Sequence, residues 1–366
     1  MMKRWQFSKR LLPLLAGLVL LLSACGREDL STLNPQGSIA QSQFDLMKLS
    51  IGIMTGVVVI VFGLSVYVLV RYRRKPGDKS IPKQVEGSHK LEIIWTVIPI
   101  ILLVILAVPT LKYVFAFAED YSKDENAVKV KVTAYQYWWE FEYPEYKIRT
   151  AQDLVIPYGK KIAVELSTKD VLHSFWIPSL AGKMDTNRID SLDKGNKNKM
   201  HFDAPEENVY RGKCAELCGP SHAYMDFKVK SVSQETFDAW VKEMQAPAKP
   251  FTGDAAVAEV FKQSCLSCHA VENEPKTAPN LKGIGSREAV AGILLNREKA
   301  SESLDQAKIE DHLRKWIKET DDVKPGNKMG VIKLTDPELD QIVDYLANYK
   351  LDSLEKINNG IPNVEE

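Results

Sequence analysis

Two short segments of the chain concentrate the sulfur and imidazole side chains that bind transition metals. Four of the five cysteines fall in the closely spaced pairs Cys214/Cys218 and Cys265/Cys268, and a histidine follows each pair. A disulfide-stapled domain usually carries an even number of widely separated cysteines. The pairs therefore indicate metal or haem chemistry, and the fifth cysteine, Cys25, needs a separate explanation.

The first segment combines two thiols, an imidazole and a thioether within residues 214–225, and His173 lies 41 residues before Cys214. Thiolates and thioethers are soft ligands and imidazole suits copper, whereas zinc sites usually take four Cys or His ligands without methionine. A blue copper site uses one cysteine. A second cysteine in the same loop predicts two bridging thiolates and two copper ions. The alternative, a C-x-x-x-C disulfide, leaves the spacing of His222 and Met225 unexplained.

The second segment reads C-x-x-C-H, the signature for covalent attachment of haem c. Cys265 and Cys268 are expected to form the thioethers to the haem, and His269 is expected to become the proximal ligand of the iron. Met329 is the only methionine in residues 251–366 and can supply the second axial ligand. Histidine paired with methionine raises the reduction potential, as an electron-transfer haem requires.

The elements that position the first segment are predicted to be short strands. Residues 128–133, 162–166 and 225–229 alternate apolar and polar side chains, and proline and glycine residues lie between them. A period of two predicts antiparallel strands with one face in water. The segment is therefore expected in a small β-sandwich or barrel.

The second segment is predicted to lie among helices. Apolar residues around Phe261 follow helical spacing, and so do those from Leu339 onward. Thr335 and Glu338 form the N-cap and the capping box that begin the later helix. We expect the two helices to pack on one another.

The first third of the chain is apolar and basic. Residues 1–118 carry 14 basic and six acidic residues. The formal net charge of the whole chain is nevertheless zero, and this balance argues against a nucleic-acid-binding protein. The runs Leu49–Val70 and Ile93–Leu111 contain no charge and are long enough to span a bilayer. Because Lys and Arg dominate the loop between them, we expect this loop in the cytoplasm and both soluble domains on the outer face of the cell membrane.

The N-terminus has the form of a secretory signal, with basic residues, the apolar run Leu11–Leu22 and then Ser23-Ala24-Cys25. This ending resembles a bacterial lipoprotein signal, in which Cys25 becomes the lipidated first residue. The alternative is an uncleaved anchor, for which the apolar run is short. Glu92, at the inner end of the second span, is either an interfacial carboxylate stabilised by the helix dipole or a proton-uptake group.

These patterns predict a multidomain membrane protein with a two-helix transmembrane hairpin, an all-β domain and an all-α domain. The expected parts are a signal peptide (1–24), an N-terminal segment with membrane helices at about 47–70 and 92–117 (25–118), a copper domain (119–245), a linker (246–252), a haem domain (253–350) and a C-terminal tail (351–366).

The pattern C-x-E-x-C-G-x-x-H-x-x-M, the upstream His-Ser-Phe and the two membrane helices resemble subunit II of bacterial cytochrome c oxidase over roughly residues 40–245. The resemblance implies a cupredoxin-like Greek-key domain with a dinuclear copper-A centre. Its expected ligands are His173, Cys214, the backbone carbonyl of Glu216, Cys218, His222 and Met225. The resemblance also implies that the Glu216 side chain faces a magnesium site shared with subunit I, and it favours proton uptake at Glu92.

The C-terminal domain resembles a class I cytochrome c, so the whole chain is similar to subunit II of a caa-type oxidase. The resemblance implies that Pro279 orients His269 through its carbonyl. It further implies that a cytochrome c donor reduces the haem, that copper A takes the electron next, and that subunit I reduces oxygen and pumps protons. The expected partners are thus subunit I and the other oxidase subunits, a cytochrome c donor and the membrane, without nucleic acid.

One aromatic segment departs from the family's pattern. After a glutamine the family usually has Trp-Tyr-Trp, whose first tryptophan receives the electron, whereas this chain has Tyr137, Trp138 and Trp139. Trp138 and Trp139 are the remaining candidates for an electron path. Core and interface packing is the alternative for both.

Two other functions stay open at this point. A copper-A subunit of a nitric oxide reductase would carry the same ligand loop, and a lipid-anchored copper-delivery or thiol-redox module would use Cys214 and Cys218 without haem. A quinol oxidase subunit II is disfavoured, because that relative lacks the copper ligands found here.

Overall fold

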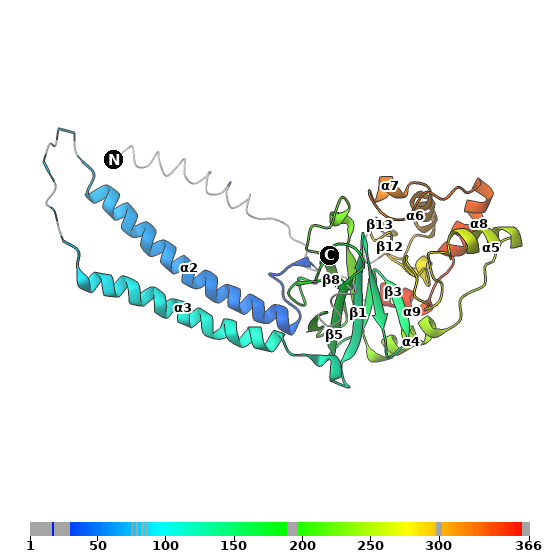
Figure 1. The fold of residues 1–366 in the computed structure, drawn as a ribbon, viewed down its shortest axis with the longest axis horizontal. Coiled ribbons are helices and arrows are strands. Elements are labelled where there is room, and N and C mark those ends of the chain that lie inside the picture. The colour runs from blue at the N-terminus through cyan, green and yellow to red at the C-terminus, as the bar shows by residue number, and fades with distance from the viewer. Residues whose placement is uncertain are drawn as a thin grey trace.

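The computed structural model describes residue 17 and residues 30–74, 76–77, 80–81, 84, 86–188, 197–297 and 302–360. These residues form, in chain order, a two-helix hairpin, a domain of two β-sheets and a helical domain (Figure 1). Apart from residue 17, the predicted signal peptide lies outside the described residues, and so does Cys25.

The hairpin consists of helices α2 (Ser38–Arg71) and α3 (His89–Phe117). Both are long and apolar enough to cross a membrane. The N-terminus of α2 and the C-terminus of α3 both adjoin the β-sheet domain, and the opposite ends of the two helices point away from it (Figure 1). This geometry agrees with the predicted topology, in which both flanks of the hairpin lie on the same side.

Helix α2 begins earlier than the apolar run predicted, because its first turn docks on the β-sheet domain. The Gly37 backbone approaches Leu180 so closely that a Cβ at position 37 would lie 2.3 Å from the Leu180 carbonyl oxygen. The backbone N–H and the hydroxyl of Ser38 both donate to the Asp203 carboxylate, at 2.9 and 2.8 Å. Lys161 donates to the other oxygen of Asp203 at 2.9 Å. The helix is thus capped from the neighbouring domain.

The β-sheet domain has two facing layers. The first sheet has the order β3-β2-β1-β5-β8, with β9 also paired to β5. Its strands are β1 (Val128–Tyr135), β2 (Trp138–Tyr143), β3 (Ile148–Ala151), β5 (Lys161–Thr168), β8 (Asn187–Arg188) and β9 (Asn198–Asp203). The second sheet has the order β4-β11-β10-β6-β7. Its strands are β4 (Asp153–Pro157), β6 (Ser174–Trp176), β7 (Met184–Asp185), β10 (Asn208–Cys214) and β11 (Phe227–Val232).

The core of this domain is aromatic. Trp139 and Phe141 of β2 pack against Phe175 of β6 and Phe227 of β11, and the rings of Phe175 and Phe227 stack with centroids 4.6 Å apart. All four side chains are buried. This shared core holds together β6, β10 and β11, at whose ends the predicted copper ligands lie.

The prediction of purely antiparallel strands is wrong. Strand β1 pairs in parallel with β5, β5 with β8, and β4 with β11, while the other pairs are antiparallel. Alternation along a strand reports only that one of its faces is buried. It does not report the direction of the neighbouring strand, which depends on how the chain crosses between the sheets.

Helix α4 (Gln234–Gln245) follows β11 and leads through the linker to the helical domain. This domain contains α5 (Ala255–Ser264), α6 (Gln306–Lys318), α7 (Thr320–Val323) and α8 (Asp336–Ala347), with a short ladder of β12 (Ala289–Val290) and β13 (Leu294–Leu295). Helix α8 begins with the predicted capping box of Thr335 and Glu338. Phe261 of α5 meets Tyr345 of α8 edge-on at 5.3 Å, so the predicted packing of these helices is confirmed.

The segment expected as a C-terminal tail contains a helix, α9 (Asp352–Gly360). Leu351, Leu354 and Ile357 belong to the hydrophobic core of the β-sheet domain. The chain therefore leaves the helical domain at the end of α8 and packs back on the domain that precedes it. Three apolar side chains on one face need such a partner to leave water.

Candidate metal centre

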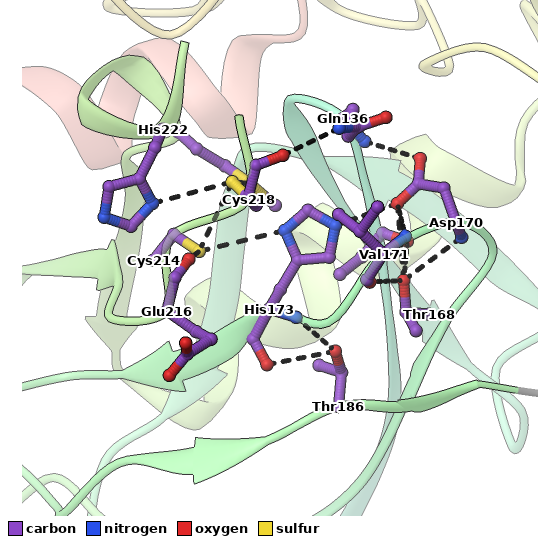
Figure 2. Close-up of polar contacts among 12 residues, drawn as sticks. Gln136, Thr168, Asp170, Val171, His173, Thr186, Cys214, Glu216, Cys218 and His222 are labelled. Carbon is purple, nitrogen blue, oxygen red and sulfur yellow. Dashed lines mark hydrogen bonds and ion pairs between the residues drawn. The ribbon is translucent and has the colours of Figure 1, made fainter. Parts of the chain in front are cut away.

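The predicted copper ligands converge at one end of the second sheet. Strand β10 ends at Cys214, and its pairing with Phe175 of β6 brings His173 beside it. The short helix η3 (His222–Tyr224) closes the loop, and Met225 follows directly before β11. Figure 2 shows His173, Cys214, Cys218 and His222 turned toward one another.

The two cysteines form the centre of this cluster. Their sulfurs lie 3.9 Å apart and both thiols are free, so the C-x-x-x-C pair is not a disulfide. His173 Nδ1 lies 3.8 Å from Cys214 Sγ, and His222 Nδ1 lies 3.5 Å from Cys218 Sγ. Met225 Sδ lies 3.9 Å from Cys218 Sγ. Each sulfur thus has a nitrogen donor of its own.

The carbonyl oxygen of Glu216 completes the donor set. It lies 3.3 Å from Cys214 Sγ, while the Glu216 side chain turns away from the sulfurs (Figure 2). The donor atoms of His173, Cys214 and Cys218 all fall within 4.8 Å of one another, and all three residues are buried. Two soft sulfurs, two imidazoles, a thioether and a carbonyl in a largely buried cluster fit a pair of copper ions.

Binding of a metal would displace the thiol protons of this cluster. Hydrogen bonds from the Cys218 thiol and from His173 lower the pKa of Cys214 far below its ordinary value, although burial opposes this. The same pairing, together with burial, raises the pKa of Cys218. Metal binding replaces such protons, because thiolate is the ligand form.

A carboxylate that the sequence analysis did not single out holds the first histidine. His173 Nε2 lies 2.9 Å from Asp170 Oδ1. The other oxygen of Asp170 accepts the Gln136 backbone N–H at 2.8 Å and the ammonium of Lys328 at 3.0 Å. Burial raises the pKa of Asp170, but these hydrogen bonds outweigh burial and hold the pKa well below its ordinary value. Asp170 precedes His173 by three residues, and this short spacing is the signal in the sequence that could have indicated the contact.

The aromatic candidates occupy different environments. Trp139 is fully buried, its indole N–H donates to the Met225 carbonyl at 3.2 Å, and its ring lies 6.0 Å from the His173 ring. Trp138 is half-buried and stacks on Tyr135 at 4.3 Å. Tyr137 is buried, and its carbonyl accepts a hydrogen bond from Lys324 of the helical domain at 2.8 Å. Of the two tryptophans, Trp139 is the one placed beside the copper ligands.

The haem motif follows the last turn of α5. Cys265 is buried, Cys268 is exposed, and the His269 backbone N–H donates to the Cys265 carbonyl at 2.9 Å. His269 Nδ1 donates to the Pro279 carbonyl at 2.7 Å, as expected from the resemblance to cytochrome c. This bond leaves Nε2 available to bind a metal. Burial lowers the pKa of His269, which favours the neutral imidazole that binds iron.

The Met329 loop is pinned on both sides. The Met329 backbone N–H donates to the Asn327 side chain at 2.7 Å, and the Met329 carbonyl accepts from Thr320 at 3.0 Å. The Met329 side chain is half-buried against the core of the helical domain, which also contains Cys265. A buried cysteine, an oriented imidazole and a thioether on one core fit a haem c.

The remaining candidates lie apart from both clusters. Glu92 is in the first turn of α3, its side chain is 52% exposed, and its carboxylate lies 3.5 Å from His89. His201 packs against the ring of Tyr121 at 4.7 Å. His312 lies 3.0 Å from the side-chain oxygen of Asn296. Both of these histidines make their contacts with residues outside the predicted ligand sets.

Three family models match the chain in succession. Residues 34–113 match the transmembrane domain of cytochrome c oxidase subunit II, residues 147–232 match its periplasmic domain, and residues 255–350 match cytochrome c. The matched ranges correspond to the helix hairpin, the β-sheet domain and the helical domain.

Curated relatives match over nearly the full length. Cytochrome c oxidase subunit 2 of Bacillus sp. (strain PS3) is 48% identical, covering 94% of this chain and 98% of that protein. The Bacillus subtilis (strain 168) subunit is 45% identical, covering 96% and 100%. Quinol oxidase subunit 2 of Bacillus anthracis is 36% identical but covers only 68% of this chain and 84% of that protein. The chain belongs to the cytochrome c oxidase subunit II family, as an oxidase subunit whose copper-A domain and fused cytochrome c domain relay electrons to subunit I.

Proposed function

We propose that this subunit receives electrons from a cytochrome c donor at its haem domain and delivers them through its copper domain to subunit I. Bound in these domains, haem c and two copper ions supply the one-electron chemistry. Cys265, Cys268, His269 and Met329 would hold the haem. The copper ions would be held by His173, Cys214, the Glu216 carbonyl, Cys218, His222 and Met225.

The observation that carries the proposal is the contact between the two ligand loops. The hydroxyl of Ser221, next to His222, donates to the Pro325 carbonyl of the Met329 loop at 2.8 Å. Lys328, next to Met329, bonds Asp170 at 3.0 Å, and Asp170 in turn bonds His173. The copper loop therefore contacts the Met329 loop through the residue next to His222, and the Met329 loop contacts the copper domain through the residue next to Met329.

The burial of both copper-loop cysteines disfavours a copper-delivery or thiol-redox module. Cys214 is 7% exposed and Cys218 is 4% exposed. A site that hands copper or disulfide equivalents to another protein needs accessible sulfur. Burial instead suits a resident centre that excludes water. The complete ligand set also distinguishes this chain from a quinol oxidase subunit, and the oxidase relatives disfavour a nitric oxide reductase.

Several finer assignments belong to the same proposal. The Glu216 carboxylate, half-exposed beside the exposed Leu217, would supply a hard oxygen ligand to magnesium at the subunit I interface. Glu92 would take up protons at the cytoplasmic end of α3, and lipidated Cys25 would anchor the outer end of the chain. Trp139, beside Met225 and His173, would lie on the electron path.

The test is Met225→Leu in the purified oxidase, with Met244→Leu as the matched control. Met244 is buried in the same domain, on α4 away from the copper loop. We expect Met225→Leu to change the mixed-valence copper EPR signal and to lower oxygen consumption at least about ten-fold, with haem absorbance retained. An unchanged copper signal and unchanged oxygen consumption, or fewer than two coppers per wild-type chain, would contradict the proposal.

A further inference from the structure

Charged side chains are buried between the copper domain and the haem domain. Lys228 and Lys230 lie on β11, Asp153 lies on β4, and Glu288 and Arg297 flank the β12–β13 ladder. The Lys228 ammonium lies 2.5 Å from Glu288, and Arg297 pairs with the other oxygen of Glu288. The Lys230 ammonium lies 3.2 Å from Asp153 and 3.8 Å from Glu288. The side chains of Lys230 and Glu288 are 0% and 2% exposed.

Helix α9 closes over this cluster. Asn358 accepts a hydrogen bond from Lys230 at 2.6 Å and donates to the Ser286 carbonyl at 2.7 Å. The Asn358 carbonyl accepts from Arg297 at 2.9 Å. Leu354 and Ile357 of the same helix belong to the copper-domain core. The cluster therefore joins three segments that are distant in sequence.

Such a cluster fixes one relative position of the domains. Removing charge from water is costly, and a buried ion is tolerated only where partners meet it with good geometry. A shift of the haem domain by a few ångströms would leave Lys228 and Lys230 without Glu288 in a dry interface. The buried charges thereby exclude other relative positions of the two domains. Selecting one arrangement in this way is the best-supported role of buried charge.

The contacts that fix the relative position of the domains continue to the Met329 loop. Ala291 follows β12, three residues after Glu288, and its carbonyl accepts a hydrogen bond from Lys324 at 2.8 Å. The same ammonium donates to the Tyr137 carbonyl of the copper domain at 2.8 Å. Lys324 begins the loop that carries Met329. The position of Glu288 is thus coupled through the ladder to the Met329 loop.

We propose that Glu288, held by Lys228 and Lys230, is a positioning residue that locks the haem domain on the copper domain. Electron transfer between the two centres then needs no docking step. The inference rests on the proposed function, because it concerns the geometry between the two centres. A carrier that is only tethered would dock and leave repeatedly, and its rate would respond to salt and viscosity.

The test compares wild type, Glu288→Gln and Glu259→Gln in the intact oxidase. Glu259 is an exposed carboxylate of the same domain, paired to Lys262 at 3.9 Å, and serves as the control. Two readouts are used: the rate of haem-to-copper electron transfer after rapid photochemical reduction, and amide hydrogen exchange in β11 and α9. For wild type and Glu259→Gln we expect a rate that is constant from about 10 to about 500 mM salt. For Glu288→Gln we expect a rate at least about ten-fold lower that depends on salt, with faster exchange in both elements.

Each outcome bears on the inference. A wild-type rate that varies with salt or viscosity overturns it, and this measurement decides even if Glu288→Gln fails to accumulate. Glu288→Gln that behaves like Glu259→Gln also overturns it, provided the haem absorbance and the two-copper signal are intact. Loss of those signals in wild type would instead contradict the proposed function.

Discussion

Asp170 connects His173, a predicted copper ligand, to the haem domain through a single carboxylate. One oxygen holds the His173 imidazole, and the other holds Lys328 beside Met329. Such outer carboxylates fix the orientation of a ligating imidazole and raise its basicity. Burial lowers the pKa of His173, but the bonds from Asp170 and Cys214 raise it overall. The residue therefore serves the copper site and the domain contact together.

Asp170→Asn is expected to weaken copper binding by about 10- to 100-fold, because the amide cannot hold His173 as the carboxylate does. Competition with a copper chelator measures the affinity, and the EPR signal reports the change at the ligand. Asp238→Asn is the matched control, since Asp238 is exposed on α4. Equal copper retention in the two variants would contradict the assigned role of Asp170.

At the scale of elements, helix α2 depends on a residue from β9. Asp203 caps the first turn of α2 through Ser38 and is itself held by Lys161. Without the cap, the backbone N–H of Ser38 at the start of the helix would lose this partner. We therefore assign the angle at which the hairpin leaves the copper domain to this contact and to the close approach of Gly37.

Asp203→Asn is expected to cost about 1 kcal/mol of local stability at the start of α2. The corresponding change is an increase of about five-fold in amide exchange at Ser38–Ser42 in the detergent-solubilised oxidase. Exchange in α8, which is capped within its own domain by Thr335, provides the internal control. Unchanged exchange in α2 would show that Gly37 alone anchors the helix.

The same carboxylate predicts a pH dependence. Burial raises the pKa of Asp203, but bonds from Lys161 and Ser38 outweigh it and hold the pKa below its ordinary value of 3.8. The folded chain then binds this proton more weakly than the unfolded chain, so the contribution is present above the ordinary value and is lost as pH falls below it. We expect the thermal unfolding midpoint to fall less in Asp203→Asn than in wild type between about pH 6 and about pH 3.

At the scale of the whole molecule, α9 makes the domain order non-sequential. The helix follows the haem domain in the chain, but its residues Leu354 and Ile357, together with Leu351 just before it, belong to the copper-domain core. It also carries Asn358 into the interdomain charge cluster. The haem domain is consequently attached at both of its ends, by the linker before it and by α9 after it (Figure 1).

Ile357→Ala is expected to lower the free energy of unfolding by about 2–5 kcal/mol, because it removes a buried side chain from a packed core. Denaturant titration followed by tryptophan fluorescence measures the loss. Asn359→Ala, an exposed position on the same helix, is expected to have little effect. Equal effects of the two substitutions would contradict the packing of α9 on the copper domain.

The sequence alone determined the chemistry that depends on local spacing. The donors between Cys214 and Met225 lie in one loop, and the haem motif and the capping box of α8 are shorter still. Their residue types and intervals are set by the geometry of a metal, a porphyrin and a helix turn. Such signals survive without knowledge of any distant contact, and the structure places the predicted copper ligands close to one another.

Only the tertiary structure decided which distant groups face one another. Lys228 and Lys230 alternate with Phe227 and Val229, which predicts a face in water, yet the haem domain covers that face and Glu288 pairs with both lysines. The parallel strand pairs, the contact of Lys328 with Asp170 and the return of α9 were equally hidden. Each depends on the free energy of burying surfaces from separate parts of the chain, and a local pattern carries no information about the surface that will cover it.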